Sequence, residues 1–303
     1  IQWYIKMIAL TYHSITKDYV PDKLNAGGKH VPAQKFEEQM RYLSQKDAIN
    51  ADGIIKKNNN SIIVTIDDGF KNNYEVAFPI LKKYNIPFII FLCTGFMNEN
   101  LIWTDKLLKL SIDVKDFKKK SIMWLKKHQF SFKEDEVTYD FLRLLFKKID
   151  TPLINEFISS FKDSNQVNSN LYSEIFKPLS WDEVRSMVKT DLCFIGSHTV
   201  NHPILSKCDY LRQYEEIENS KLIIEDQLNE KVSLFAYPNG SKNDYNVETL
   251  KILKKLDFKY AFTTSFGYNR SFNPFEIERI GITSDLPMWK FKLLINRLWR
   301  PFA

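Results

Sequence analysis

The sequence predicts an α/β barrel-like fold, because short apolar runs alternate along the chain with segments of helical periodicity. The clearest apolar runs, at 62–66, 87–92 and 192–195, are typical of buried strands. Between the first two runs, the helical segment 79–84 implies a right-handed parallel crossover. Polar candidate residues directly follow several of these runs, at the strand ends where the chemistry of parallel barrels lies.

The N-terminal part of the chain contributes the first strand, predicted over 4–12 and followed by His13. The next stretch, 14–32, is polar, so we expect a loop that leaves His30 on the surface. Hydrophobic residues recur at helical spacing in 34–44, which predicts a helix.

The composition changes between about residues 98 and 177, where Lys and Phe become frequent and apolar residues keep a helical spacing. We interpret this segment as a helical insertion on one side of a single domain that spans 1–303. Ser131 and Glu134 have the spacing of a capping box, which predicts that a helix starts there.

After the insertion, helices and strands alternate again. Ser180 and Glu183 repeat the capping-box spacing and predict a helix through Met187. Asn246 is expected to cap a later helix. The remaining predicted elements are a surface helix at 209–228, strands at 232–237, 260–264 and 274–282, and a cationic amphipathic helix at 289–299 that packs on the body of the protein.

Bulk composition excludes some classes of function. The net charge of +6 is spread over 303 residues, and no basic run is interleaved with aromatics, so we expect no nucleic-acid partner. No apolar run reaches the roughly 20 residues of a membrane span, and no signal peptide is apparent. The cytoplasm is therefore the favoured compartment, with secretion or the cell surface as the alternative if the N-terminus was trimmed. The three cysteines have no metal-binding or redox spacing.

Two carboxylates, Asp67 and Asp68, follow the central apolar run directly. By itself this pattern is typical of a strand that ends in a polar turn. Far downstream, however, His198 and His202 stand four positions apart and can share a cation. One aspartate would complete a three-ligand site that leaves positions open for water and substrate, and the other could accept a proton from the water. This combination predicts a hydrolytic metal centre.

Two motifs in this sequence resemble those of the polysaccharide deacetylases of the NodB-homology carbohydrate esterase group. Thr65-Ile66-Asp67-Asp68-Gly69 is similar to the family's Thr-Phe-Asp-Asp-Gly, and His198-Thr199-Val200-Asn201-His202 is similar to its His-Ser/Thr-x-x-His. The resemblance runs from about Ile8 to Ile282 and implies a distorted (β/α) barrel. It also implies that Asp67 is the general base and that Asp68, His198 and His202 bind a divalent metal, most often Zn²⁺, with Co²⁺, Ni²⁺ and Fe²⁺ as alternatives.

The chain departs from the family pattern at the third motif, where Ala236 stands in the position of an arginine. Arg279 is our candidate to orient Asp67 instead, and a surface salt bridge is the alternative interpretation. The resemblance places an oxyanion donor at the backbone N–H of Asn239, where it would stabilise the negative oxygen of a tetrahedral intermediate.

A second departure is the missing late Leu-x-x-x-His motif, since no histidine follows His202. His13 is the natural substitute as general acid, because the chain around it resembles the branch that includes the poly-β-1,6-N-acetylglucosamine deacetylases. Trp181 and Tyr237 are candidate substrate-binding residues, and core packing is the alternative for Trp181.

The leading hypothesis is a metal-dependent hydrolase that removes N-acetyl groups from a GlcNAc-type sugar or polysaccharide and releases acetate. The alternatives are a non-catalytic carbohydrate-binding relative and a metal-dependent ester or cyclic-amide hydrolase on the same scaffold. The Lys-rich insertion and the basic last helix are compatible with an anionic glycan, or with contact to a membrane surface or to glycan-synthesis machinery. The sequence leaves the glycan and the oligomeric state open.

Overall fold

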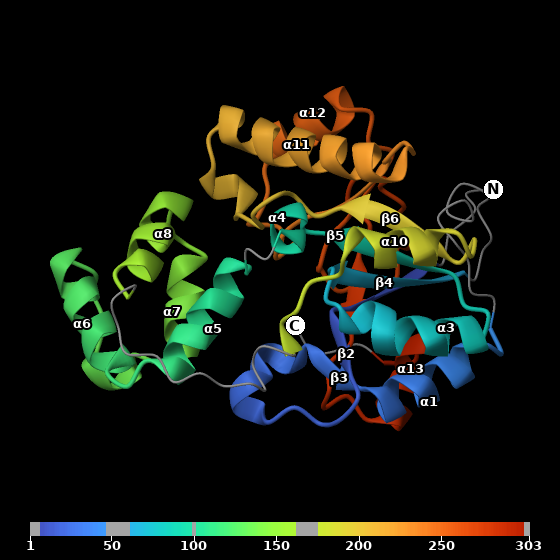
Figure 1. Ribbon diagram of the computed structural model, residues 1–303, viewed down its shortest axis with the longest axis horizontal. Coiled ribbons are helices and arrows are strands. Elements are labelled where there is room, and N and C mark those ends of the chain that lie inside the picture. Colours follow the sequence, from blue (N-terminus) through green and yellow to red (C-terminus); the bar gives the residue numbers. More distant parts are fainter. Residues whose placement is uncertain (1–6, 47–60, 99–100, 162–174, 300–303) are drawn as a thin grey trace.

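The computed structural model describes residues 7–46, 61–98, 101–161 and 175–299. Within these residues, seven parallel strands form one sheet (Figure 1). The strands are β1 (Ile8–Tyr12), β4 (Ile62–Asp68), β5 (Phe88–Leu92), β6 (Cys193–Ser197), β7 (Leu234–Ala236), β8 (Tyr260–Phe262) and β9 (Arg279–Gly281). Their order is β8-β7-β6-β5-β4-β1-β9, so β4 lies in the interior of the sheet. Residues 4–6 of the predicted first strand lie outside the described residues.

The sheet curls into a nearly closed barrel, which confirms the predicted fold class. A parallel bridge joins Phe262 to Ile277, just before β9, and the backbone N–H of Thr263 donates to the carbonyl of Ile277 at 2.8 Å. These contacts bring together the two edge strands of the sheet. Inward-pointing apolar residues fill the barrel, among them Ala9, Ile63 and Phe91.

Helices cover the outside of the barrel and bury a larger apolar cluster against the strands. Figure 1 shows α11 and α12 on one side and α1, α3 and α13 on another. The covering helices are α1 (Ala33–Leu43), α3 (Phe78–Lys83), α10 (Trp181–Val188), α11 (Tyr210–Leu228), α12 (Val247–Lys255) and α13 (Met288–Ile295). The predicted caps are present: Ser180 and Glu183 form a reciprocal capping box, and the side chain of Asn246 accepts a hydrogen bond at the start of α12.

The last helix, α13, packs on the body of the protein as predicted, because Phe291, Leu294 and Ile295 are buried against the main core. Across the described ranges, no helix combines the length and the apolar character that crossing a bilayer requires.

The segment between β5 and β6 contains the predicted helical insertion, which is green in Figure 1. It follows the short helix α4 (Thr94–Met97), and its helices are α5 (Trp103–Asp113), α6 (Phe117–Lys127), α7 (Tyr139–Phe146) and α8 (Thr151–Ser159). They enclose an apolar cluster distinct from the barrel core, rich in aromatic rings such as Trp124 and Phe157. The insertion leaves the barrel from the carboxyl end of β5, so it stands beside the end of the barrel where the candidate site lies.

Ser131 does not begin a helix, so the prediction made from its capping-box spacing is wrong. Residues Glu134–Glu136 form only a single 3₁₀ turn, because this acidic stretch has no apolar side chain to bury. The next helix, α7, begins at Tyr139, capped by the side chain of Thr138, and buries Leu142 and Phe146.

The expectation that His30 is a surface residue is also wrong. Residues Ser14–Thr16 (β2) and His30–Pro32 (β3) form a small parallel pair, and this pairing directs the imidazole of His30 inward. The ring is fully buried, edge-on to the rings of Phe70 and Phe176. Burial lowers the pKa of His30 well below its usual value, so this imidazole is neutral at pH 7.

Candidate metal centre

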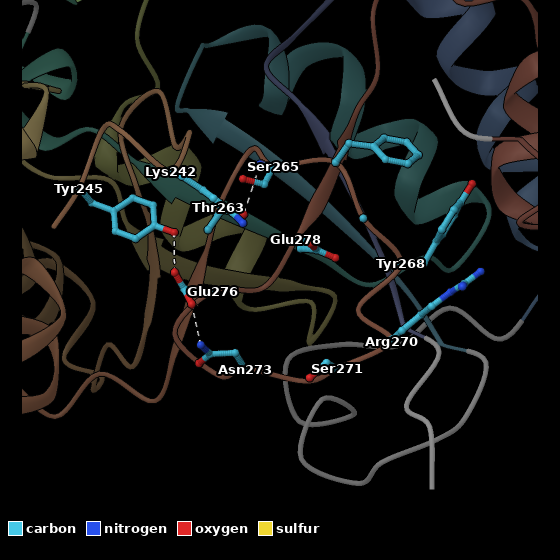
Figure 2. Close-up of a pocket in the computed structure, with 12 residues that line it drawn as sticks. Lys242, Tyr245, Thr263, Ser265, Tyr268, Arg270, Ser271, Asn273, Glu276 and Glu278 are labelled. Carbon is cyan, nitrogen blue, oxygen red and sulfur yellow. Dashed lines mark hydrogen bonds between the residues drawn. The ribbon is translucent and has the colours of Figure 1, made fainter. Parts of the chain in front are cut away.

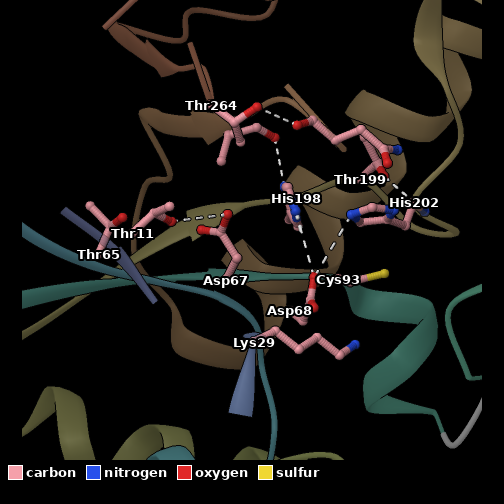
Figure 3. Close-up of polar contacts among 12 residues, drawn as sticks. Thr11, Lys29, Thr65, Asp67, Asp68, Cys93, His198, Thr199, His202 and Thr264 are labelled. Carbon is pink, nitrogen blue, oxygen red and sulfur yellow. Dashed lines mark hydrogen bonds and ion pairs between the residues drawn. The ribbon is translucent and has the colours of Figure 1, made fainter. Parts of the chain in front are cut away.

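The carboxyl ends of β4 and β6 bring the aspartate pair and the histidine pair together, as Figure 3 shows. The Nε2 atoms of His198 and His202 lie 3.7 Å and 3.8 Å from Oδ1 of Asp68. One ligand atom from each of these three buried residues lies within 4.8 Å of the others. Residues more than a hundred positions apart therefore converge on one point.

The donor set fits a divalent metal ion. Oδ1 of Asp68 is buried and has no hydrogen-bond partner among the described residues, which is costly for a carboxylate unless a cation binds there. Nδ1 of His198 donates to the carbonyl of Ala236 at 2.7 Å, which turns the lone pair of its Nε2 toward Asp68. Two imidazole nitrogens and a carboxylate oxygen are ligands typical of catalytic zinc sites.

Burial sets the protonation of these ligands. It lowers the pKa of His198 and, more strongly, that of His202, so both imidazoles are neutral and able to bind a metal at pH 7. It also raises the pKa of Asp68 to about 6 in the metal-free chain. A bound cation would favour the ionised form of that carboxylate.

Asp67, next to Asp68 in the chain, is held by Arg279. The guanidinium donates to both carboxylate oxygens, at 2.7 Å and 2.8 Å, and Arg279 is fully buried. Its remaining bonds go to Oγ1 of Thr65 and the carbonyl of Thr263. Burial opposes ionisation of Asp67, but the charge of Arg279, its hydrogen bonds and the neighbouring imidazoles together outweigh burial and hold the pKa of Asp67 well below its usual range. The contact predicted between Arg279 and Asp67 is thus present, and it is buried.

The backbone around the site is unusual, because several non-glycine residues adopt positive φ. The values are +76° at Asp68, +65° at Thr199, +55° at His202 and +58° at Asn239. Such conformations are costly, above all for β-branched Thr199, and they persist only where surrounding contacts enforce them.

His13 and Asn239 lie on strand ends that neighbour the metal ligands. His13 follows β1, whose register pairs Tyr12 with Ile66, so the next position runs beside Asp67. Burial lowers the pKa of His13, while the charges of Asp68 and Asp67 act in the opposite direction. Asn239 lies in the turn after β7, and its side-chain nitrogen is buried without a partner in the described part of the chain. The catalytic roles of both residues stay predictions.

The two candidate substrate-binding residues lie in different surroundings. Tyr237 is fully buried, stacks on Tyr245 and donates its hydroxyl to the carbonyl of Phe275 at 2.8 Å. Its side chain is not exposed, and its role in substrate binding stays a prediction. Trp181 is half-buried at the first position of α10 and packs against the main core, so its contact with substrate is untested.

Sequence reasoning missed Lys29, which lies beside Asp68 in Figure 3. Its Nζ is 2.5 Å from Oδ1 of Asp105, on α5 of the insertion, and lies over the rings of Phe70 and Phe176. No local pattern marks this lysine, because its partners come from distant parts of the chain.

A separate cavity of about 790 Å³ lies beside the loop that joins β8 to β9 (Figure 2). Its lining is polar and aromatic and includes Lys242, Tyr245 and Glu278, but none of the metal ligands. Thr263 links this cavity to the ion pair of Arg279 and Asp67: it lines the cavity, and its carbonyl accepts a hydrogen bond from Arg279.

Comparison with known proteins agrees with this geometry. The sequence model of the polysaccharide deacetylase family matches residues 55–261. The chain belongs to the polysaccharide deacetylase family. Within this family it is 21% identical over 273 residues to the putative polysaccharide deacetylase YxkH of Bacillus subtilis, covering 86% of this chain and 66% of that protein. It is 30% identical over 123 residues to the poly-beta-1,6-N-acetyl-D-glucosamine N-deacetylase of Staphylococcus epidermidis, covering 35% of this chain and 40% of that one. The chain thus spans from two fifths to about two thirds of these relatives.

Solved structures share the fold at low identity. The Streptococcus pyogenes deacetylase PplD in complex with acetate matches with a TM-score of 0.64 and 19% identity, covering 98% of this chain and 99% of that one. IcaB from Ammonifex degensii matches with a TM-score of 0.60 and 19% identity, covering 96% of each chain. A de-N-acetylase from Aggregatibacter actinomycetemcomitans matches with a TM-score of 0.57 and 15% identity, covering 94% of this chain and 99% of that one. These likenesses establish the barrel fold of the family for this chain.

Proposed function

We propose that this chain is a metal-dependent hydrolase that removes N-acetyl groups from an N-acetylated glycan and releases acetate. The observation that carries the proposal is the cluster of Asp68, His198 and His202 beside a second carboxylate, Asp67, that a buried arginine keeps ionised. The family membership supports hydrolysis of an acetylated glycan.

The division of labour between the two aspartates follows from their contacts. Asp68, His198 and His202 would hold a divalent ion, which when bound would polarise the acyl carbonyl and lower the pKa of a water molecule. Asp67 would accept the proton of that water. Arg279 would keep Asp67 ionised and oriented, because both of its carboxylate oxygens accept hydrogen bonds from the guanidinium.

The remaining steps fall to residues on neighbouring strand ends. The backbone N–H of Asn239 would stabilise the negative oxygen of the tetrahedral intermediate. His13 would donate a proton to the leaving amine, because an amine leaves far more readily when protonated. Its place beside the aspartate pair supports this role, since the negative charges of Asp68 and Asp67 partly offset the burial that lowers the pKa of His13.

The names of similar proteins support an N-acetylated glucosamine glycan as substrate class. One relative is named a poly-beta-1,6-N-acetyl-D-glucosamine N-deacetylase, and one similar structure holds acetate. We therefore propose β-linked N-acetylglucosamine polymers as the first substrates to test.

The test measures acetate release from β-1,6- and β-1,4-linked N-acetylglucosamine oligomers, after chelation and reloading with Zn²⁺, Co²⁺, Ni²⁺ or Fe²⁺. We expect metal-dependent release by the native chain and none by Asp67→Asn. Oligomer binding without release would instead indicate a carbohydrate-binding protein. Release from O-acetylated or cyclic-amide substrates alone would indicate a different hydrolase on the same scaffold.

A further inference from the structure

The two histidine ligands are anchored differently. His198 is oriented through its own ring, because its Nδ1 bonds to the carbonyl of Ala236. The Nδ1 of His202 is buried and has no such partner in the described residues. The position of the His202 imidazole therefore depends on the backbone that carries it, which is the loop 199–201 between the two ligands.

That loop is held by a buried carboxylate on helix α11. Oε2 of Glu216 accepts hydrogen bonds from the backbone N–H groups of Val200, at 3.0 Å, and Asn201, at 2.8 Å. Its Oε1 accepts from the side-chain amide of Asn201 at 2.8 Å and lies 2.6 Å from a guanidinium nitrogen of Arg212. Glu216 is fully buried, and an ionised carboxylate persists in such a place only when its oxygens are satisfied in this way.

The opposite side of the loop is held by the start of α4, which follows β5. The backbone N–H groups of Thr94 and Gly95 donate to the carbonyls of Thr199, at 3.1 Å, and Val200, at 2.8 Å. A Cβ at Gly95 would lie 2.5 Å from the carbonyl oxygen of Val200, so only glycine lets the backbone of α4 come this close to the loop. The loop is held between the start of α4 and Glu216, which accounts for the positive φ at Thr199 and His202.

We infer that Glu216 is a positioning residue of the metal centre: its carboxylate sets the loop 199–201 and thereby aims His202 at the ion. The inference rests on the proposed metal site. Partners that orient a metal ligand in this way change metal affinity by about 10- to 100-fold when removed.

The test compares Glu216→Gln with a matched control, Glu215→Gln, in the full chain. Gln keeps the size of Glu but turns an N–H₂ group toward one set of donors, so one or two of the three hydrogen bonds from the loop are lost, depending on which oxygen it replaces. Glu215 lies on the same helix, is exposed, and its carboxylate is 4.0 Å from the same Arg212. We expect Co²⁺ to bind Glu216→Gln about 10- to 100-fold more weakly, with a changed visible absorption spectrum, and to bind Glu215→Gln as it binds the native chain.

A Glu216→Gln chain that loses thermal stability but binds Co²⁺ with native affinity and spectrum would overturn the inference, because Glu216 would then be only structural. If Glu216→Gln does not fold, Asn201→Leu removes one donor to Glu216 without adding charge, and native Co²⁺ affinity and spectrum in that variant would overturn it equally. A native chain that binds no Co²⁺, Zn²⁺ or Ni²⁺ would instead overturn the proposed metal site itself.

Discussion

The carboxyl end of the barrel buries a cluster of charged and polar side chains, whereas the core of the helical insertion beside it consists mainly of aromatic and aliphatic side chains. At the barrel end, Asp67 and Arg279 are both fully buried and satisfy each other. In the insertion, the ring of Phe157 lies 4.8 Å from that of Phe146 and 5.1 Å from that of Trp124. The insertion core therefore stabilises the fold by apolar burial, whereas the barrel end buries charged groups, which costs stability unless those groups are paired.

The two regions meet beside the metal ligands. Lys29 lies next to Asp68 (Figure 3) and forms an ion pair with Asp105 of the insertion. On α8, the hydroxyl of Thr151 lies 3.9 Å from the sulfur of Cys208, in the chain segment that follows His202. The insertion thus borders the site without supplying a metal ligand among its described residues.

The largest expected effect comes from removing a metal ligand. Asp68→Asn or His198→Ala should abolish both metal binding and acetate release, because each removes a ligand atom from the cluster. Asp67→Asn should keep the metal and lose turnover. Metal content by elemental analysis, with acetate release, checks both; equal metal loss in all three variants would contradict the assigned roles.

Replacing the proposed acid should have the next largest effect. His13→Ala is expected to lower kcat by roughly 10²- to 10⁴-fold while metal content stays native, since the leaving amine would lack its proton donor. The pH profile of kcat should also lose its alkaline limb. A fully active His13→Ala enzyme would mean that another group supplies the proton.

Two core substitutions, one in each region, test whether the insertion and the barrel end contribute differently to stability and to turnover. Phe157→Ala in the insertion and Phe91→Ala in the barrel should each cost about 3–5 kcal/mol of unfolding free energy, because both rings are fully buried. Phe91 also packs against the Arg279 guanidinium, 5.6 Å from its ring centre, so only Phe91→Ala should impair turnover directly. Denaturant unfolding and kcat, measured while each variant is fully folded, test this. Equal loss of kcat in both variants would show that the insertion shapes the catalytic end.

The smallest expected effect is on the pH dependence of metal binding. Burial raises the pKa of Asp68 to about 6 in the metal-free chain, so proton and metal compete for this carboxylate below that pH. Below about pH 6, metal affinity should fall by up to tenfold per pH unit, because binding must then release one proton from this carboxylate. Burial lowers the pKa values of His198 and His202, so their protonation competes with the metal less than that of Asp68. A competition titration between about pH 5 and pH 7 measures the slope, and a two-proton slope would contradict it.

In the metal-free chain, the free energy of unfolding should change with pH in the opposite direction to the metal affinity. A carboxyl whose pKa is raised on folding stabilises the fold below its unfolded value of about 3.9 and loses that contribution as pH rises through about 6. Thermal unfolding without metal should therefore show stability falling over this window, and bound metal should remove the fall.

The sequence by itself predicted the candidate metal site at the barrel end. Local patterns mark a buried strand that ends at Asp67 and Asp68, and the types and spacing of His198 and His202 select a cation. The capping residues Ser180 and Asn246 likewise act within a few positions of themselves, so their helices could be located from sequence. The pairing of Arg279 with Asp67 was predicted because the expected arginine was missing at Ala236.

Only the tertiary structure decided which side chains surround that chemistry. Three kinds of contact join elements that are distant in the chain. They are the burial of His30 and Tyr237, the ion pair of Lys29 with Asp105, and the hydrogen bonds from the loop 199–201 to Glu216. No local pattern records such contacts, because burial and hydrogen bonding depend on which distant segment covers a side chain, whereas strand and helix patterns depend on near neighbours in the chain.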